Sequence, residues 1–210
     1  MKTRCVIIAG GDCDPLLFQN VCDADFVIAA DSGLNHCKLN NITPDLVVGD
    51  FDSYFDELPQ GVETIKLPTH KDDTDLLFAS KCGIERGFTD FVIFGGHGSR
   101  PDQSFAMYST LVWLVNAAEK VSVSAVCNGF EVFAVKNSTL NIKADKNRYL
   151  SVFSVDGDAY GVDISGAEYP LSNATITERF PIGVSNCAVN DTTVSVKNGT
   201  LLIMLVDKNI

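Results

Sequence analysis

Short apolar runs alternate with helical stretches between the N-terminus and Cys127, and this alternation most constrains the fold. Each apolar run is short and borders glycine, proline or aspartate, which is typical of buried strands that lead into loops. Most of these strands are followed by a stretch that can form a helix. Strands that alternate with helices indicate a mainly parallel sheet with helices on both faces, the architecture of the α/β class.

The same pattern predicts the individual elements of this half. Strands are predicted at Cys5–Ala9, Phe26–Ala30, Leu46–Val48, Val62–Leu67, Asp90–Gly95 and Val121–Val126. Helices are predicted at Pro15–Cys22, at Leu34–Leu39, from Asp73 or Thr74 to Arg86, and from Asp102 to about Glu119. Asp73 or Thr74 caps the third helix, and Gly87 ends it. In the fourth helix, apolar residues recur at spacings of three and four, at Phe105, Tyr108, Val112 and Val115.

Beyond Cys127 the pattern changes to short strands without helical periodicity. Strands are predicted at Phe130–Val135, Thr139–Lys143, Leu150–Val155, Ala159–Ile164, Leu171–Thr177, Thr192–Val196 and Leu201–Val206. Asn-Gly pairs at 128–129 and 198–199 are strong hairpin signals, and the second predicts a final hairpin. This spacing favours a small β-sandwich. We therefore expect two domains, an α/β domain at residues 1–127 and an all-β domain at residues 128–210.

Charge and composition argue against some classes of partner. The formal net charge of −11 argues against nucleic acid, because phosphate backbones need a surface of lysine and arginine. No run of about 18 apolar residues is present, which argues against a membrane span. The apolar run Cys5–Ala9 is too brief for a signal peptide and fits a first strand better. The seven cysteines are scattered, odd in number and without a C-x-x-C pair, which favours free thiols in a reducing cytoplasm.

Two acidic segments lie between Pro44 and Asp75. Gly49-Asp50-Phe51-Asp52-Ser53 follows an expected strand, and Lys71-Asp72-Asp73-Thr74-Asp75 precedes an expected helix. In an open α/β sheet, ligands bind at the carboxyl ends of strands and at helix N-termini. Because Mg²⁺ takes oxygen ligands and bridges carboxylates to substrate phosphates, the two segments together indicate a magnesium site. The alternative is that these aspartates only cap helices and form turns.

A glycine-rich loop, residues 95–103, joins an expected strand to the long helix. Its three glycines let the backbone approach a ligand closely, and the helix N-terminus favours an anion. Arg100 adds donors suited to phosphate oxygens, whereas Asp102 either caps the helix or contacts a metal. Asp31 follows another strand, where it adds a carboxylate to the same rim or forms an ordinary turn. His97 fits a loop residue better than a metal ligand.

Other nucleotide and acyl-transfer motifs are missing from the sequence. There is no Gly-x-x-x-x-Gly-Lys-Ser/Thr phosphate loop and no Gly-x-Ser-x-Gly nucleophile elbow. Gly10-Gly11-Asp12 stands after the first strand in place of Gly-x-Gly-x-x-Gly, so a dinucleotide site there is not expected.

Six motifs in order along the chain resemble the thiamine pyrophosphokinase (thiamine diphosphokinase) family. They are Asp31-Ser32-Gly33, Pro44-Asp45 with residues 49–53, residues 71–75, residues 95–103, Ser165-Gly166-Ala167-Glu168-Tyr169-Pro170-Leu171 and Gly183-Val184-Ser185-Asn186. The resemblance implies a Rossmann-like α/β domain followed by a β-sandwich. It also implies Mg²⁺-dependent transfer of pyrophosphate from ATP to the hydroxyl of thiamine, giving thiamine diphosphate and AMP. The implied assembly is a homodimer with active sites at the subunit interface.

The resemblance also assigns roles to residues of this chain. The implied catalytic residues are Asp50, Asp52, Asp75, Arg100 and Asp102, of which the four aspartates hold Mg²⁺ and the ATP phosphates. The ATP-binding rim comprises Asp31, Lys71, Asp73, Thr74, Ser99 and Arg100, and the thiamine pocket comprises Tyr169, Ser185 and Asn186. Many relatives have glycine at Ser32 and histidine at Gln103, so Gln103 is given no role. Tyr169, where some relatives have tryptophan, keeps an aromatic ring for thiamine.

Two alternative functions remain open from sequence. One is another Mg²⁺-dependent phosphoryl or nucleotidyl transferase on the same pair of domains. The other is a non-catalytic thiamine-binding protein with the same fold. The residue that takes the hydroxyl proton is also open, with Asp75 and Asp102 as candidates.

Overall fold

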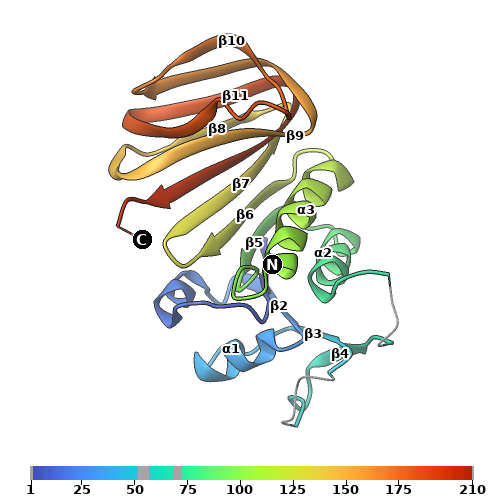
Figure 1. The fold of residues 1–210 in the computed structure, drawn as a ribbon. Coiled ribbons are helices and arrows are strands. Elements are labelled where there is room, and N and C mark those ends of the chain that lie inside the picture. Colours follow the sequence, from blue (N-terminus) through green and yellow to red (C-terminus); the bar gives the residue numbers. More distant parts are fainter. Residues whose placement is uncertain (1, 52–56, 69–71, 210) are drawn as a thin grey trace. The chain divides into compact units, whose positions relative to one another are not determined.

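The computed structural model describes residues 2–51, 57–68 and 72–209 (Figure 1). The chain divides into two compact units, Met1–Asn128 and Gly129–Ile210. Within the described ranges, no helix combines the length and the apolarity needed to cross a lipid bilayer.

Parallel strands form the sheet of the first unit. The strands are β1 (Arg4–Ile8), β2 (Asp25–Ala30), β3 (Leu46–Gly49), β4 (Glu63–Lys66), β5 (Asp90–Phe94) and β6 (Ser122–Cys127). They are arranged in the order β6-β5-β1-β2-β3-β4, and each neighbouring pair is parallel. In a parallel sheet the carboxyl ends of all strands lie along one edge, so the loops that follow them gather there.

Helices cover both faces of this sheet. They are η1, a 3₁₀ helix (Pro15–Asn20), α1 (Gly33–Leu39), α2 (Asp75–Glu85) and α3 (Pro101–Ala117). Val6 and Ile8 of β1 share a buried cluster with Phe18 of η1 and Leu34 of α1. Cys5 points to the opposite face, where a Cβ at Gly83 of α2 would lie 3.1 Å from its Sγ. The alternation of side chains along a strand thus supplies an apolar surface to both helical layers.

The start of α2 follows from its sequence. Thr74 is the N-cap, and its Oγ1 accepts a hydrogen bond from the Leu77 amide at 3.2 Å. This bond satisfies one of the backbone donors that a helix start leaves unpaired. Gly87, with φ of +84°, follows the end of the helix, as its sequence predicts.

The buried face of α3 matches its apolar spacing only in part, because Val115 is buried whereas Tyr108 and Val112 are half-buried. Met107, Leu111 and Leu114 are buried, whereas Phe105 is 72% exposed. Two polar residues, Ser104 and Thr110, share the buried face. The Ser104 hydroxyl donates to the Arg100 carbonyl, and the Thr110 hydroxyl donates to the Ala106 carbonyl. Since these hydroxyls are satisfied within the helix, polarity does not keep them at the surface.

Antiparallel strands form the second unit. They are β7 (Phe130–Lys136), β8 (Thr139–Ile142), β9 (Asp145–Ala167), β10 (Leu171–Ile176) and β11 (Gly183–Asp207). β9 and β11 each join two of the strands that the sequence predicts to be separate. Leu150 of β9 pairs with Leu205 on one side and with Asn186 on the other, so β11 flanks β9 on both edges there.

The prediction of a final hairpin at Asn198-Gly199 is wrong. Ile203 pairs with Phe133 of β7 and with Val152 of β9, so both edges of this arm of β11 are occupied. Val194 pairs with Leu140 of β8 and with Ile164 of β9. The two arms therefore pair with other strands rather than with each other, and Gly199, with φ of +125°, marks the bend between them.

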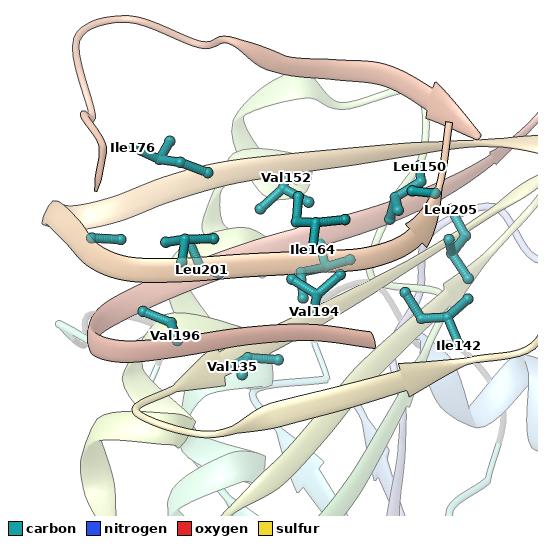
Figure 2. Packing of buried hydrophobic residues seen from close by; sticks show 14 residues of the cluster. Val135, Ile142, Leu150, Val152, Ile164, Ile176, Val194, Val196, Leu201 and Leu205 are labelled. Carbon is teal, nitrogen blue, oxygen red and sulfur yellow. The ribbon is translucent and has the colours of Figure 1, made fainter. Parts of the chain in front are cut away.

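The core of the second unit is a buried aliphatic cluster with contributions from every strand of the unit. Figure 2 shows its side chains converging between the strands. The labelled members are Val135, Ile142, Leu150, Val152, Ile164, Ile176, Val194, Val196, Leu201 and Leu205. Branched aliphatic residues dominate this core because they pack closely on a pleated surface.

Candidate functional site

A cavity of about 600 Å³ lies among the loops of the first unit. Loops that follow β1, β2, β3 and β5 contribute to it, together with the segment that leads into α2. Its lining includes Gly10, Gly11, Asp12, Asp31, Ser32, Asp50, Asp73, Thr74, Asp75, Leu76, Gly95, Gly96, His97, Gly98, Ser99, Arg100, Gln103 and Ala106. These residues come from segments far apart in the sequence, as expected for the carboxyl edge of a parallel sheet.

Two of the glycine-containing loops contact each other directly. The Gly11 amide donates to the Gly95 carbonyl at 2.7 Å, and a Cβ at Gly11 would lie 2.5 Å from that same oxygen. Gly95 adopts φ of +65°, a conformation that side chains disfavour. From the sequence, the glycines of the 95–103 loop are expected to let a ligand approach the backbone closely. The structure adds a second reason, because Gly95 and Gly98 lie against the loop after β1.

Four of the predicted carboxylates line this cavity, namely Asp31, Asp50, Asp73 and Asp75. Asp31 has φ of +47°, and its amide donates to the Val48 carbonyl at 2.7 Å, which ties the end of β2 to β3. Asp75 is the first residue of α2, where a negative charge interacts favourably with the helix dipole. The Asp73 carboxylate accepts from Lys81 Nζ at 2.8 and 2.6 Å, so a cation of α2 already offsets its charge.

Arg100 and Ser99 also line the cavity, at the start of α3. The Arg100 guanidinium pairs with Asp102, whose side chain is 63% exposed and lies outside the cavity lining. The hydrogen bond from Arg100 lowers the pKa of the Asp102 carboxyl and raises that of Arg100. An ion pair this exposed contributes little to stability, so Arg100 can exchange Asp102 for a phosphate at small cost.

Two predicted site residues, Asp52 and Lys71, lie outside the described residues. Across residues 2–51, 57–68 and 72–209, no three or more His, Cys, Asp or Glu residues form a group that could hold a metal ion. The carboxylates that line the cavity are nevertheless hard oxygen donors. They suit Mg²⁺, which is usually held by one or two carboxylates together with waters and substrate phosphates.

The predicted thiamine residues lie together in the second unit. Tyr169 is 64% exposed, whereas Asn186 is only 7% exposed. The Asn186 Oδ1 accepts from the amides of Tyr169 and Cys187 at 3.0 and 2.8 Å, and its Nδ2 donates to the Tyr169 carbonyl at 2.8 Å. Asn186 therefore fixes the backbone beneath an exposed aromatic ring. Next to it, the Ser185 amide donates to Ser151 Oγ at 3.1 Å.

Comparison with known proteins supplies the deciding observation. The family "Thiamin pyrophosphokinase, catalytic domain" matches residues 18–123, which is half of the chain. The chain belongs to the thiamin pyrophosphokinase family. A second match, "Thiamin pyrophosphokinase, vitamin B1 binding domain", covers residues 137–202. The family resemblance stated from the sequence motifs is therefore confirmed, and with it the activity, ATP-dependent transfer of pyrophosphate to thiamine.

Individual relatives agree with this assignment. Thiamine pyrophosphokinase of Bacillus subtilis is 27% identical over 184 residues, which cover 84% of this chain and 85% of that protein. The fold matches the crystal structure of the B. subtilis protein with a TM-score of 0.89 at 24% identity, covering 98% of this chain and 100% of that one. The Geobacillus thermodenitrificans structure matches with a TM-score of 0.81 at 22% identity, covering 99% of each chain.

Some cavity residues were not assigned a role from the sequence. Gly10, Gly11 and Asp12 line the cavity. In the sequence, these residues were considered only as a dinucleotide-binding motif, which they do not match. The signal was present, since a glycine pair directly after the first strand of an α/β sheet lies at the ligand-binding edge. Gln103 also lines the cavity.

Proposed function

We propose that this member of the family transfers pyrophosphate from ATP to the thiamine hydroxyl in a Mg²⁺-dependent reaction at the cavity of the first unit. The observation that carries the proposal is the convergence of acidic loops, glycine loops and Arg100 on one cavity of about 600 Å³. Carboxylates for a cation and donors for phosphate are the two components that transfer from ATP requires.

In the proposed reaction, the thiamine hydroxyl oxygen forms a bond to the β-phosphorus of ATP. The bond from that phosphorus to the oxygen shared with the α-phosphorus breaks, and AMP leaves with the bond's electron pair. The hydroxyl proton passes to a carboxylate or to water, with Asp75 and Asp102 as the candidate acceptors. Bound Mg²⁺ supplies charge neutralisation for the phosphate oxygens.

The protein's own residues divide this work. Arg100 and the start of α3 bind phosphate oxygens, because guanidinium donors and helix N-termini both favour anions. Asp50 and Asp75, which both line the cavity, would hold the metal. Asp52, Lys71 and Asp102 are assigned to the same centre from their motifs alone. Asp31, Asp73, Thr74 and Ser99 complete the ATP-binding rim.

We assign the two halves of the chain different roles. Residues 1–127 form a Rossmann-like domain that binds ATP and Mg²⁺, and residues 128–210 form a β-sandwich that binds thiamine and mediates dimerisation. The exposed Tyr169 ring supports the second role, because aromatic rings attract cations such as thiamine. The active protein is proposed to be a homodimer with active sites at the subunit interface. Its seven free cysteines, all in described residues, support a reducing cytoplasm.

The direct test is product analysis with purified protein, ATP and Mg²⁺, in the presence and absence of thiamine. We expect AMP to form in amounts equal to thiamine diphosphate, and only when thiamine and Mg²⁺ are both present. Formation of ADP would show γ-phosphoryl transfer by another kind of transferase. Thiamine binding by calorimetry without ATP turnover would show a binding protein instead.

A further inference from the structure

His36 of α1 contacts the loop that follows β1. Its Nε2 lies 2.8 Å from the carbonyl oxygen of Gly11, twenty-five positions away in the sequence. A carbonyl oxygen can only accept, so Nε2 must carry the hydrogen, which excludes the neutral tautomer protonated at Nδ1 alone. The ring also packs against Phe18 with centroids 5.6 Å apart.

Gly11 connects this contact to the cavity. Its amide donates to the Gly95 carbonyl at 2.7 Å, and both glycines line the cavity. Glycine has no side chain to restrict its backbone, so the orientation of its peptide groups depends on such bonds. One bond fixes the peptide before Gly11, and the bond from His36 fixes the peptide after it.

The peptide after Gly11 carries the amide of Asp12. In a trans peptide, C=O and N–H point in opposite directions, so a carbonyl directed at His36 turns the Asp12 N–H away from the histidine. A Cβ at Gly98 would lie 2.9 Å from the Asp12 nitrogen, which places this amide beside the glycine loop after β5. Asp12 and Gly98 both line the cavity.

We propose that His36 is a positioning residue that orients the Gly11–Asp12 peptide so that the Asp12 amide donates to a phosphate oxygen of ATP. The proposal rests on the function assigned to the cavity. His36 does not touch the nucleotide and acts through the backbone.

Two substitutions separate this role from simple packing against Phe18. His36→Gln keeps an amide donor at the place of Nε2, whereas His36→Asn puts its amide at the place of Nδ1, short of Gly11. Both remove the aromatic ring, so both lose the same contact with Phe18. Leu39→Ala, an exposed position on the same helix, controls for changes to α1 itself.

We expect His36→Asn to raise the KM for ATP about tenfold, the scale of one lost hydrogen bond, with the KM for thiamine unchanged. His36→Gln should stay within about threefold of the wild type. The resonance of the Asp12 amide, which belongs to the peptide that His36 holds, should shift in the Asn variant and stay closer to its wild-type position in the Gln variant. Equal KM values for ATP in the two variants, with equal positions of the Asp12 amide resonance, would overturn the proposal.

Two measurements on the wild-type protein avoid the risk that a variant misfolds. Nitrogen-15 spectra of the His36 ring should show a hydrogen on Nε2, and an unprotonated Nε2 would overturn the proposal. Titration with Mg²⁺ and α,β-methylene-ATP, which cannot release AMP, should shift the Asp12 amide resonance. Because neither measurement needs thiamine or turnover, a failure of the proposed reaction and a failure of the His36 role give different results.

Discussion

The cavity of the first unit and the core of the second unit are specified in different ways. The cavity is built from polar loops whose positions depend on backbone hydrogen bonds and glycine contacts, such as that between Gly11 and Gly95. The core is a set of aliphatic side chains whose positions depend on how closely they pack against one another (Figure 2). Changes in the cavity should therefore alter activity with little effect on stability, and changes in the core should do the reverse.

The largest effect should come from truncation in the core. Leu201 is fully buried in the second unit, and Leu201→Ala should lower the free energy of unfolding by about 2–5 kcal/mol, since it removes apolar contacts and leaves a cavity. Urea denaturation measures this change, with the half-exposed Ile182→Ala as control. Turnover per folded molecule should persist. A loss of turnover without loss of stability would contradict the distinction between core and cavity.

Next in size is the loss of one cavity carboxylate. Asp75→Asn should lower turnover by about 10²-fold or more, the scale for one electrostatic contact at a reacting centre. The melting temperature should change little. Asp72→Asn is the matched control, because Asp72 belongs to the same segment but is exposed and outside the cavity lining. Near-normal turnover of the Asp75 variant would remove this residue from the mechanism.

A smaller effect is expected at the thiamine site. Tyr169→Ala should raise the KM for thiamine by up to about tenfold and leave the KM for ATP unchanged, because a stacked ring contributes about 0.5–1.5 kcal/mol. Tyr160→Ala removes another exposed tyrosine of the same unit and should change neither constant. Steady-state kinetics with each substrate varied in turn would decide, and equal KM values for thiamine in both variants would count against Tyr169.

Acid should act mainly on a structural ion pair in the first unit. Burial raises the pKa of Asp25, but hydrogen bonds from Arg4 and the Cys22 amide outweigh burial and lower it overall. A lowered folded-state pKa contributes stability that is present above about pH 4 and lost as pH falls through the folded value. In Asp25→Asn, stability should therefore fall less steeply below pH 4, as thermal melts would measure. An unchanged slope would exclude Asp25 as the cause.

The smallest effect should be at the exposed face of α3. Phe105→Ala should change the free energy of unfolding by less than about 0.5 kcal/mol, because the ring is largely in solvent. Leu111→Ala, on the buried face of the same helix, should cost about 2–5 kcal/mol. A large loss of stability in the Phe105 variant would mean that Phe105 packs against the core, as the apolar spacing of the helix predicts.

Local sequence signals predicted much of the first unit. The Leu46–Val48 run, the cap at Asp73 or Thr74 and the Gly87 stop each depend on neighbours in the chain. The structure confirms the strand and the stop, and it shows that Thr74 is the cap. Features that depend on distant partners were missed. The bend at Gly199 is determined by β7, β8 and β9, and the hydrogen bond from His36 to Gly11 joins residues twenty-five positions apart.

The site shows the same division. Motifs predicted that carboxylates from separate loops belong together. Asp31, Asp50, Asp73 and Asp75 line one cavity, whereas Asp102 lies outside its lining. The motifs could not show that Lys81 pairs with Asp73, or that the Asn186 amide bonds to the backbone of Tyr169. Such pairings depend on side-chain positions that only the folded sheet and helices define.

The most direct test of the account is a crystal structure with Mg²⁺ and α,β-methylene-ATP. We expect the triphosphate in the cavity of the first unit, its β-phosphate between Asp75 and the glycine loop after β5, with Mg²⁺ joining the phosphates to the aspartates. Nucleotide bound elsewhere, with Asp50 and Asp75 contacting neither metal nor phosphate, would contradict the account.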